Sequence, residues 1–239
     1  MPAPQDGDWV EGLLEVFFPP ACTGCGKVLP RKASFCERCE SEVERLPSAH
    51  CTRCGEPGDF DRRQCARCHL RPPPFSRAFA PFLHHGPIAR AIHRFKYEDR
   101  PELAPALGEA LAGESFRFLA DAPAAICAIP LHRERLRQRK YDQAQLLARE
   151  LARLTGRRCV WDALTRERST ARQVGLTESA RDRNVSGAFC GRASVAGLSV
   201  LLIDDVFTTG ATARAATSAL LESGAAEVQV LTLARAFSG

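Results

Sequence analysis

The chain has 239 residues, of which 45% are hydrophobic and 26% charged, enough for one or two folded domains with a substantial core. No apolar run approaches the roughly 18 residues that a membrane-spanning helix needs, and the acidic N-terminus lacks the positive start of a secretory signal, so we expect a cytoplasmic protein. The formal net charge of +5 arises after residue 72, because residues 1–72 carry ten Lys and Arg against eleven Asp and Glu.

The first predicted element is an N-terminal amphipathic segment over residues 1–20. The pattern stops at two prolines, residues 19 and 20. Five apolar side chains recur before them at helical spacing: Trp9, Leu13, Leu14, Phe17 and Phe18. We expect this stripe to pack on the rest of the protein, and contact with a membrane is the alternative.

An internal repeat predicts a double zinc ribbon over residues 21–71. Two units of CxxC, ten residues and CxxC are offset by 29 residues. A CxxC knuckle brings two thiolates to one Zn²⁺, and two knuckles complete a tetrahedral structural site. We therefore predict two Zn²⁺ ions, bound by sequential quartets because each repeat is self-sufficient; interleaved quartets and merely paired surface thiols are the alternatives. The predicted ligands are Cys22, Cys25, Cys36, Cys39, Cys51, Cys54, Cys65 and Cys68.

The residues around these cysteines carry further expectations. Gly26 and Gly55 follow the first knuckle of each repeat, where a tight turn aims N–H groups at the thiolates. His50 and His69 flank ligands, but the quartets are full, so we expect them beside the sites or exposed. The RPPP segment at 71–74 predicts a stiff linker. Three cysteines without partners are predicted to be core or buried-edge thiols: Cys127, Cys159 and Cys190.

Strand and helix patterns alternate over residues 76–239. Apolar runs predict strands over 78–83, 124–129, 200–203 and 228–233. Helical periodicity predicts helices over 88–95, 102–111, 141–154 and 211–221. This alternation is typical of an α/β fold with a parallel sheet covered on both faces.

The strongest chemical signal in this region is VLLIDDVFTTGAT, residues 200–212. An aliphatic strand delivers Asp204 and Asp205 to the carboxyl end of the sheet, where adjacent carboxylates repel each other unless hydroxyls or a cation engage them. The next residues open a helix with the N–H and hydroxyl groups that suit a phosphate: Thr208, Thr209, Gly210, Ala211 and Thr212. A ribose 5-phosphate fits both the acidic pair and the loop that follows it. The alternative is that these residues only cap the strand and the helix of an ordinary strand-turn-helix unit.

These residues resemble the signature for phosphoribosyl pyrophosphate (PRPP) of type I phosphoribosyltransferases. From residue 13 to residue 235 the chain resembles the ComF family, a double zinc ribbon fused to such a domain. The resemblance includes RFKY at 94–97, IPLH at 129–132 and LTRERSTARQVGLTESARDRNVSGAF at 164–189. It also includes RKYDQ at 139–143, where the family commonly shows RGFNQ.

The resemblance implies roles for particular residues. Asp204 and Asp205 would hold the ribose hydroxyls and residues 208–212 the 5-phosphate, with Mg²⁺ bound alongside PRPP. Leu131, His132 and Arg133 would form the pyrophosphate loop, and residues 165–185 would cover the site. Further candidate contacts are Lys96, Gln173, Arg181 and Asn184, of which Lys96 and Arg181 could instead be ordinary surface charges.

Two departures from the family pattern bear on the substrate. Thr208 stands where purine-salvage transferases place an aspartate that handles the base proton, which argues against hypoxanthine or guanine as acceptor. Phe207 replaces a small aliphatic residue and could reshape the covering segment. The pattern therefore identifies the donor, PRPP, better than the acceptor.

A basic run adjoins the predicted pyrophosphate loop. If the run is helical, Arg133, Arg137 and Lys140 share one face. The run is either a solvated face or a surface that tracks single-stranded DNA, with Tyr141 and Phe95 as stacking rings. Its members are His132, Arg133, Arg135, Arg137, Arg139 and Lys140.

The predicted function is PRPP binding with Mg²⁺ in DNA uptake, natural transformation or a related nucleotide-linked process. If the protein is catalytic, the resemblance implies a phosphoribosyltransferase that transfers a pentosyl group with loss of pyrophosphate. Two alternatives stay open: a non-enzymatic module that handles single-stranded nucleic acid with PRPP as a regulator, and a zinc-ribbon adaptor that docks a transformation or helicase protein.

Overall fold

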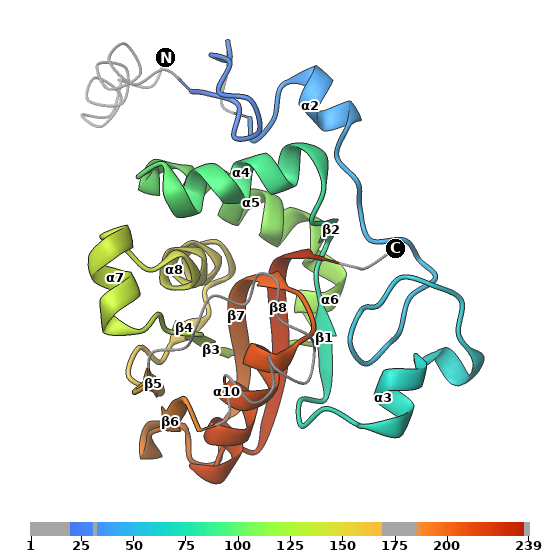
Figure 1. Cartoon of the computed structure of the whole chain (residues 1–239), viewed down its shortest axis with the longest axis vertical. Helices are drawn as coiled ribbons and strands as arrows, with labels where there is room; N and C mark the ends of the chain where they lie inside the picture. Colours follow the sequence, from blue (N-terminus) through green and yellow to red (C-terminus); the bar gives the residue numbers. More distant parts are fainter. Residues whose placement is uncertain (1–19, 31–32, 169–184, 186, 237–239) are drawn as a thin grey trace, which may run out of the picture.

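A parallel β-sheet organises the computed structural model, which describes residues 20–30, 33–168, 185 and 187–236 (Figure 1). The strand order is β1-β8-β7-β3-β4, with β2 also pairing with β8, and every pair in this six-stranded sheet is parallel. The strands are β1 (Arg77–Phe79), β2 (Phe82–Leu83), β3 (Ala125–Ala128), β4 (Arg158–Cys159), β7 (Ser199–Phe207) and β8 (Glu227–Arg235). The predicted α/β class is confirmed.

The central strands are buried on both faces, which is why they read as continuous apolar runs. Leu201 and Ile203 of β7 pack into one hydrophobic cluster, whereas Val200 and Leu202 pack into a second. Successive side chains of a strand point to opposite faces, so both clusters are needed to cover β7. The run predicted over 200–203 is the start of a nine-residue strand that continues to Phe207.

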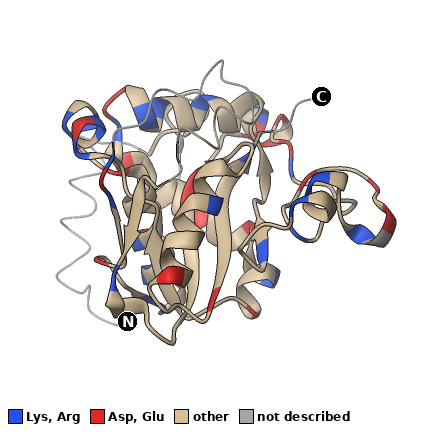
Figure 2. Cartoon of the chain, turned by 60° about the horizontal axis from the view of Figure 1, so that its bottom comes forward, with Lys and Arg blue, Asp and Glu red and all other residues tan. Residues whose placement is uncertain are grey.

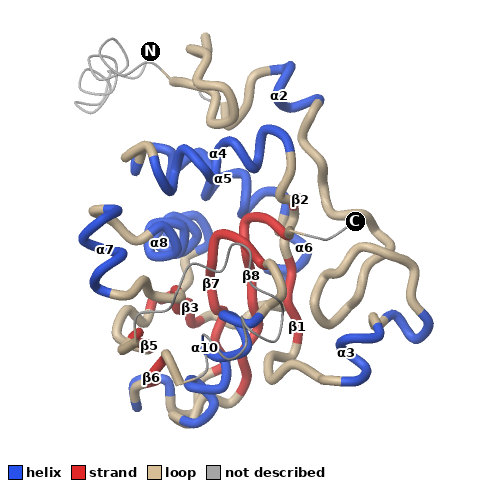
Figure 3. Tube along the Cα trace, in the orientation of Figure 1, coloured by secondary structure: helices blue, strands red, loops and turns tan. Residues whose placement is uncertain are grey.

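Helices cover the two faces of the sheet (Figure 3). The side chains of α4 (Gly86–Tyr97), α5 (Ala104–Glu114) and α8 (Gln143–Thr155) belong to the first cluster. Those of α10 (Ala211–Glu222) belong to the second, together with β5 (Leu164–Arg166) and β6 (Phe189–Gly191), which form a separate antiparallel pair. Charged residues lie mostly on the helices and loops, and the sheet carries few (Figure 2). Among the described residues, no helix is both long and apolar enough to span a bilayer.

Each predicted helix of the α/β region is observed, with its ends set by local chemistry. Helix α8 begins where the Asp142 side chain accepts from the N–H of Gln145 at 3.1 Å and ends at Gly156, whose φ is 69°. The predicted strand over 78–83 is split into β1 and β2, because Pro81 interrupts the pairing with β8. Short elements without a long periodic pattern were missed: α6 (Phe116–Ala120), β4, β5, β6, η2 (Pro101–Leu103) and η3 (Ala193–Val195).

The two zinc-ribbon repeats pack on different parts of the α/β region (Figure 1). The first repeat, with α2 (Glu37–Ser41), shares a hydrophobic cluster with α4 and α5. The second, with η1 (Asp61–Arg63) and α3 (Ala66–Leu70), shares the other cluster with Phe75 and α10. The predicted linker at 71–74 therefore does not hold the repeats away from the α/β region. Residues 1–19, which include the predicted amphipathic stripe, lie outside the described residues.

Candidate functional site

The cysteines of each repeat converge in space. In each of two clusters all Sγ atoms lie within 4.8 Å of one another: Cys22, Cys25, Cys36 and Cys39, and Cys51, Cys54, Cys65 and Cys68. The Sγ atoms of Cys25 and Cys36 are 3.8 Å apart, and those of Cys54 and Cys65 are 3.7 Å apart. A tetrahedral ion with Zn–S bonds of about 2.3 Å needs a sulfur spacing of about 3.8 Å. Both clusters therefore fit one zinc ion each, with sequential quartets.

The same backbone contacts shape both clusters. Gly26 and Gly55 have φ of 77° and 73°, and each donates its N–H at 2.8 Å to the carbonyl of the first cysteine in its repeat. The N–H groups of Cys36 and Cys65 lie 3.3 Å from the Sγ atoms of the first cysteines. Positive φ favours glycine, so the predicted tight turns at Gly26 and Gly55 are confirmed. The N–H groups of Cys36 and Cys65, which stabilise the first thiolates, lie outside those turns.

The remaining histidines and cysteines of the sequence analysis lie outside these clusters. His50 is half-buried, with Nδ1 2.7 Å from the Pro47 carbonyl oxygen, and His69 is exposed. Burial raises the pKa of the Cys127 thiol to about 12. Cys190 is exposed, so the prediction of a buried thiol is wrong there: β6 alternates, and Phe189 takes the inward position.

We expect two zinc ions per chain, and the first cluster should release its ion faster. Cys25 is exposed, whereas all four cysteines of the second cluster are buried, so a chelator reaches the first ion more readily. Release to a chromophoric chelator should be biphasic, with Cys36→Ser removing the fast phase and Cys65→Ser the slow one. A metal content near one per chain, or one substitution emptying both clusters, would contradict two independent sites.

Two adjacent carboxylates lie in the last part of β7, inside the strand and not after it. The Lys96 ammonium, at the end of α4, lies 2.7 Å from Asp205 Oδ1, with the two side chains only 18% and 11% exposed. The Asp205 N–H donates to Asp204 Oδ1 at 2.8 Å. Lys96 thus neutralises one carboxylate of the pair, and its ammonium is not an ordinary surface charge.

The electrostatics of the pair favour a cationic or hydroxyl-bearing ligand. Burial, and then the charge of Asp205, raise the pKa of Asp204 to about 7, although Lys96 acts in the opposite direction. A cation or a hydroxyl donor that approaches such a carboxyl group stabilises its anionic form. Asp204 is therefore suited to a cationic or hydroxyl-bearing ligand.

The loop after β7 turns sharply into α10. Gly210 has φ of 79°, and a Cβ atom at this position would lie 2.5 Å from Cζ of Phe207. The first turn of α10 leaves its N–H groups without helical acceptors, as any helix start does. The Thr209 hydroxyl lies 3.4 Å from the N–H of Ala211. The loop is thus compact, and the Phe207 ring occupies the space where a side chain at position 210 would lie.

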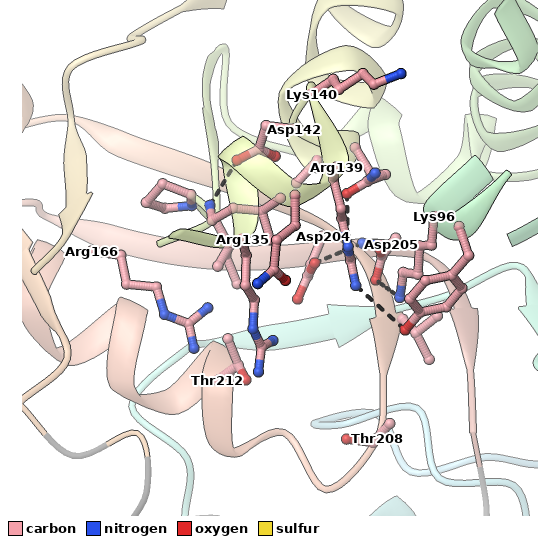
Figure 4. A pocket seen from close by; sticks show the side chains of 18 of the residues that line it. Lys96, Arg135, Arg139, Lys140, Asp142, Arg166, Asp204, Asp205, Thr208 and Thr212 are labelled. Carbon is pink, nitrogen blue, oxygen red and sulfur yellow. Dashed lines mark hydrogen bonds and ion pairs between the residues drawn. The ribbon is translucent and has the colours of Figure 1, made fainter. Parts of the chain in front are cut away.

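A cavity of about 660 Å³ lies where β3 and β7 end (Figure 4). It contains Thr208 and Thr212 of the loop and the predicted loop residue Leu131. Charged side chains of both signs line it: Lys96, Asp99, Arg135, Arg139, Lys140, Asp142, Arg166, Asp204 and Asp205. The carboxyl end of a parallel sheet is where α/β folds bind ligands, and this cavity has the volume of a small-molecule site.

The basic run is divided between two faces of α7 (Arg133–Arg139). Arg135 and Arg139 are half-buried and line the cavity, whereas Arg133 and Arg137 are exposed outside it. Lys140 does not share the outer face as predicted, because its φ of 66° ends the helix and its ammonium pairs with Asp99. Spacing of four residues along one helix explains both pairs.

The sequence analysis did not single out Arg166, which the structure brings into the cavity. Arg166 lies on β5, with its guanidinium carbon 5.1 Å from the centre of the Phe189 ring. Arg135 and Arg166 point toward Thr212 (Figure 4). Burial lowers the pKa of Arg166, and the charge of Arg135 lowers it further. Two cations held together beside a helix start favour an anion there.

Asp142 fixes the predicted pyrophosphate loop. Its Oδ2 accepts from the N–H of Leu131 at 2.7 Å, while its Oδ1 caps α8. Burial raises the pKa of Asp142, and these N–H donors oppose that shift. The sequence signal was available, since Asp142 replaces the asparagine of the family pattern. His132 caps α7, and neither His132 nor Arg133 lines the cavity.

Several predicted contacts lie elsewhere. Gln173, Arg181 and Asn184 lie outside the described residues. The prediction of a stacking ring is wrong for Phe95, which is fully buried. Stacking by Tyr141 stays a prediction: its ring is half-buried, with its centre 5.8 Å from that of Phe95, and its hydroxyl donates to the Phe95 carbonyl at 2.6 Å.

Comparisons with protein families agree with both parts of the structure. Residues 13–69 match the family described as double zinc ribbon domain, and residues 143–239 match the phosphoribosyl transferase domain. A solved structure of glutamine PRPP amidotransferase from B. subtilis is similar with a TM-score of 0.40 and 24% identity, covering 58% of this chain and 30% of that one. This likeness is too distant to add to the description of the site.

Curated relatives match over most of their length. DNA utilization protein YhgH of Escherichia coli K12 is 35% identical over 207 residues, which cover 84% of this chain and 90% of that protein. Competence protein F of Haemophilus influenzae is 29% identical over 228 residues, 92% of this chain and 99% of that protein. Competence protein ComFC of Bacillus subtilis is 28% identical over 209 residues, covering 84% and 83%.

Proposed function

The chain belongs to the ComF family, and from this premise we propose that it binds PRPP with Mg²⁺ in a process linked to DNA uptake or utilization. One observation carries the proposal. Asp204, Asp205 and two residues of the loop, Thr208 and Thr212, line the same cavity as the cations Arg135 and Arg166. A ribose bearing a 5-phosphate and a pyrophosphate needs hydroxyl acceptors flanked by anion-binding groups, and this cavity offers both.

Each part of the ligand has a chemical counterpart. The ribose hydroxyls would donate to the carboxylates of Asp204 and Asp205, and the 5-phosphate would accept from the N–H groups at the start of α10. Arg135 and Arg166 lie on the side of Thr212 and would add charge-assisted hydrogen bonds to that phosphate (Figure 4). Arg139, on the same face of α7 as Arg135, also lines the cavity and would bind the pyrophosphate.

Mg²⁺ prefers oxygen ligands, and the carboxylates of the cavity are of that type. When bound with PRPP it would supply charge neutralisation for the pyrophosphate. The chain's own residues would hold the donor in place: Asp142 keeps the Leu131 backbone in position, and Lys96 limits repulsion within the acidic pair. If the protein is catalytic, its cations would stabilise the departing pyrophosphate as the bond to the anomeric carbon breaks.

The test is calorimetry of PRPP binding to wild type and Asp205→Asn, with and without Mg²⁺. Asparagine keeps the size of the side chain but removes a charge-assisted hydrogen bond worth about 1.5 to 3 kcal/mol, so the affinity should fall roughly ten- to hundredfold. Asp121→Asn, at an exposed position outside the cavity, is the matched control and should bind as wild type does. Folded wild type that fails to bind millimolar PRPP would overturn the proposal.

Handling of single-stranded DNA is a second candidate function, supported by the outer face of α7 and by the names of the relatives. We expect Arg133→Ala with Arg137→Ala to lower DNA affinity and its salt dependence while leaving PRPP binding unchanged. Arg135→Ala with Arg139→Ala should do the reverse, because those side chains line the cavity. Equal effects of both pairs on both ligands would contradict the division of roles between the two faces.

A further inference from the structure

The second zinc-ribbon repeat contacts the loop at 208–212. Arg67 of α3 donates from Nη1 to the carbonyl oxygen of Thr209 at 3.3 Å, across 142 residues of sequence. Arg214 donates to the same oxygen at 3.0 Å from the first turns of α10. The helix that carries ligand Cys68 therefore also carries a side chain that contacts the loop.

Fixing this carbonyl fixes the loop. The peptide between Thr209 and Gly210 is trans, so its C=O and N–H groups point in opposite directions. While the two arginines hold the Thr209 carbonyl, the Gly210 N–H is directed away from the zinc cluster. If the peptide were turned the other way, the partial negative charge of the carbonyl oxygen would face the incoming phosphate, and the loop would lose an N–H donor.

A second path runs through Arg235, at the end of β8. Its side chain is 1% exposed, and Nη1 donates to the Cys54 carbonyl at 2.6 Å while Nη2 lies 3.9 Å from Cys54 Sγ. The guanidinium also pairs with Glu56 and stacks on Phe207 at 4.7 Å. Phe207 in turn occupies the space beside Gly210. Contacts thus run from the zinc ligand Cys54 through Arg235 and the Phe207 ring to Gly210 of the loop.

Charge and fold explain why zinc matters to both paths. Four thiolates around Zn²⁺ carry a formal charge of about −2, which attracts Arg235, whose Nη2 lies 3.9 Å from Cys54 Sγ. Arg67 is positioned by α3, which begins after ligand Cys65 and contains ligand Cys68. Without the ion, the cluster loses this charge and the repeat loses the metal that stabilises its fold. We propose that zinc in the second cluster, through the positioning residues Arg67 and Arg235, holds the loop at 208–212 in the conformation that receives a phosphate, and that the first cluster does not. The ligand rests on the proposed function.

The internal repeat supplies the control. Arg38 occupies the position in the first repeat that Arg67 has in the second, 29 residues later, and pairs with Glu42 on the surface with 88% of its side chain exposed. Among the described residues, the contacts of the first repeat are with α4, α5 and β2, and none reaches the loop. Arg67→Ala and Arg38→Ala therefore remove equivalent arginines with different neighbours.

The test measures loop order and ligand binding in the full chain. In Arg67→Ala, with both zinc ions retained, we expect faster amide hydrogen exchange over 207–212 and roughly tenfold weaker PRPP binding, while Arg38→Ala matches wild type. Cys65→Ser should have a larger effect on both measurements than Cys36→Ser. Reciprocally, PRPP should slow zinc release from the second cluster and not from the first.

Two failures are distinguishable. If wild type does not bind PRPP, the proposed function fails, and hydrogen exchange still decides the coupling. The coupling is refuted if Arg67→Ala and Cys65→Ser leave hydrogen exchange of the loop unchanged. It is also refuted if wild type binds PRPP and both variants bind it with the affinity of wild type. Restored affinity in Arg67→Lys, which keeps the donor, would show that the hydrogen bond to Thr209 is responsible.

Discussion

Replacing Gly210 by valine is expected to weaken PRPP binding severely while leaving both zinc clusters filled. A side chain at position 210 would block the approach of the phosphate to the backbone. The structure gives two further reasons why the loop cannot keep its conformation with valine at this position. At φ of 79° a β-branched residue is strained, and its Cβ would lie 2.5 Å from Phe207. Phe207 is held by Phe75, at 6.0 Å between ring centres, and by Arg235. The loop must therefore move.

The expected loss of PRPP affinity is roughly a hundredfold or more, equivalent to about 3 kcal/mol, as measured by calorimetry. Gly156→Val is the matched control. Gly156 has φ of 69°, but nothing lies within 4 Å of its added Cβ, and it ends α8 away from the cavity. It should lower stability without changing affinity. Gly210→Val that binds PRPP within threefold of wild type would exclude the loop from phosphate binding.

Replacing Arg235 by methionine is expected to lower the free energy of unfolding by about 3 kcal/mol or more. Methionine keeps much of the volume but leaves the Cys54 carbonyl and the Glu56 carboxylate without their buried cation. Removing one partner of a buried charged pair costs more than the pair contributes, since the other charge remains desolvated. Urea unfolding followed by circular dichroism measures the change.

Arg94→Met is the comparison for the first repeat. Arg94 donates to the carbonyl oxygens of Cys22 and Thr23 at 3.1 and 2.9 Å, but its carboxylate neighbour Glu98 is 47% exposed and stays hydrated without it. We expect a smaller loss, about 1 to 2 kcal/mol. Equal losses in the two variants would show that Arg235 has no special part in joining its repeat to the sheet.

Local patterns were sufficient for much of the candidate site. The cysteine quartets, the knuckle glycines and the strand that carries Asp204 and Asp205 are each encoded within a few residues of sequence. Zinc ligation depends on CxxC spacing, and strand and helix depend on hydrophobic period, so these features can be read without tertiary structure. The errors, such as Phe95 as a stacking ring, arose where residue type suggested a role but burial decided otherwise.

By itself, the sequence determined the two zinc quartets, the parallel α/β class and the acidic pair followed by a phosphate-type loop. Only the tertiary structure decided what surrounds that loop: Lys96 meets Asp205 across 109 residues, and Arg67 meets Thr209 across 142. Only the structure, likewise, divided the basic run into arginines that line the cavity and arginines that face outward. Such contacts have no local pattern, because they depend on which helix and which zinc repeat the folded sheet brings to the end of β7.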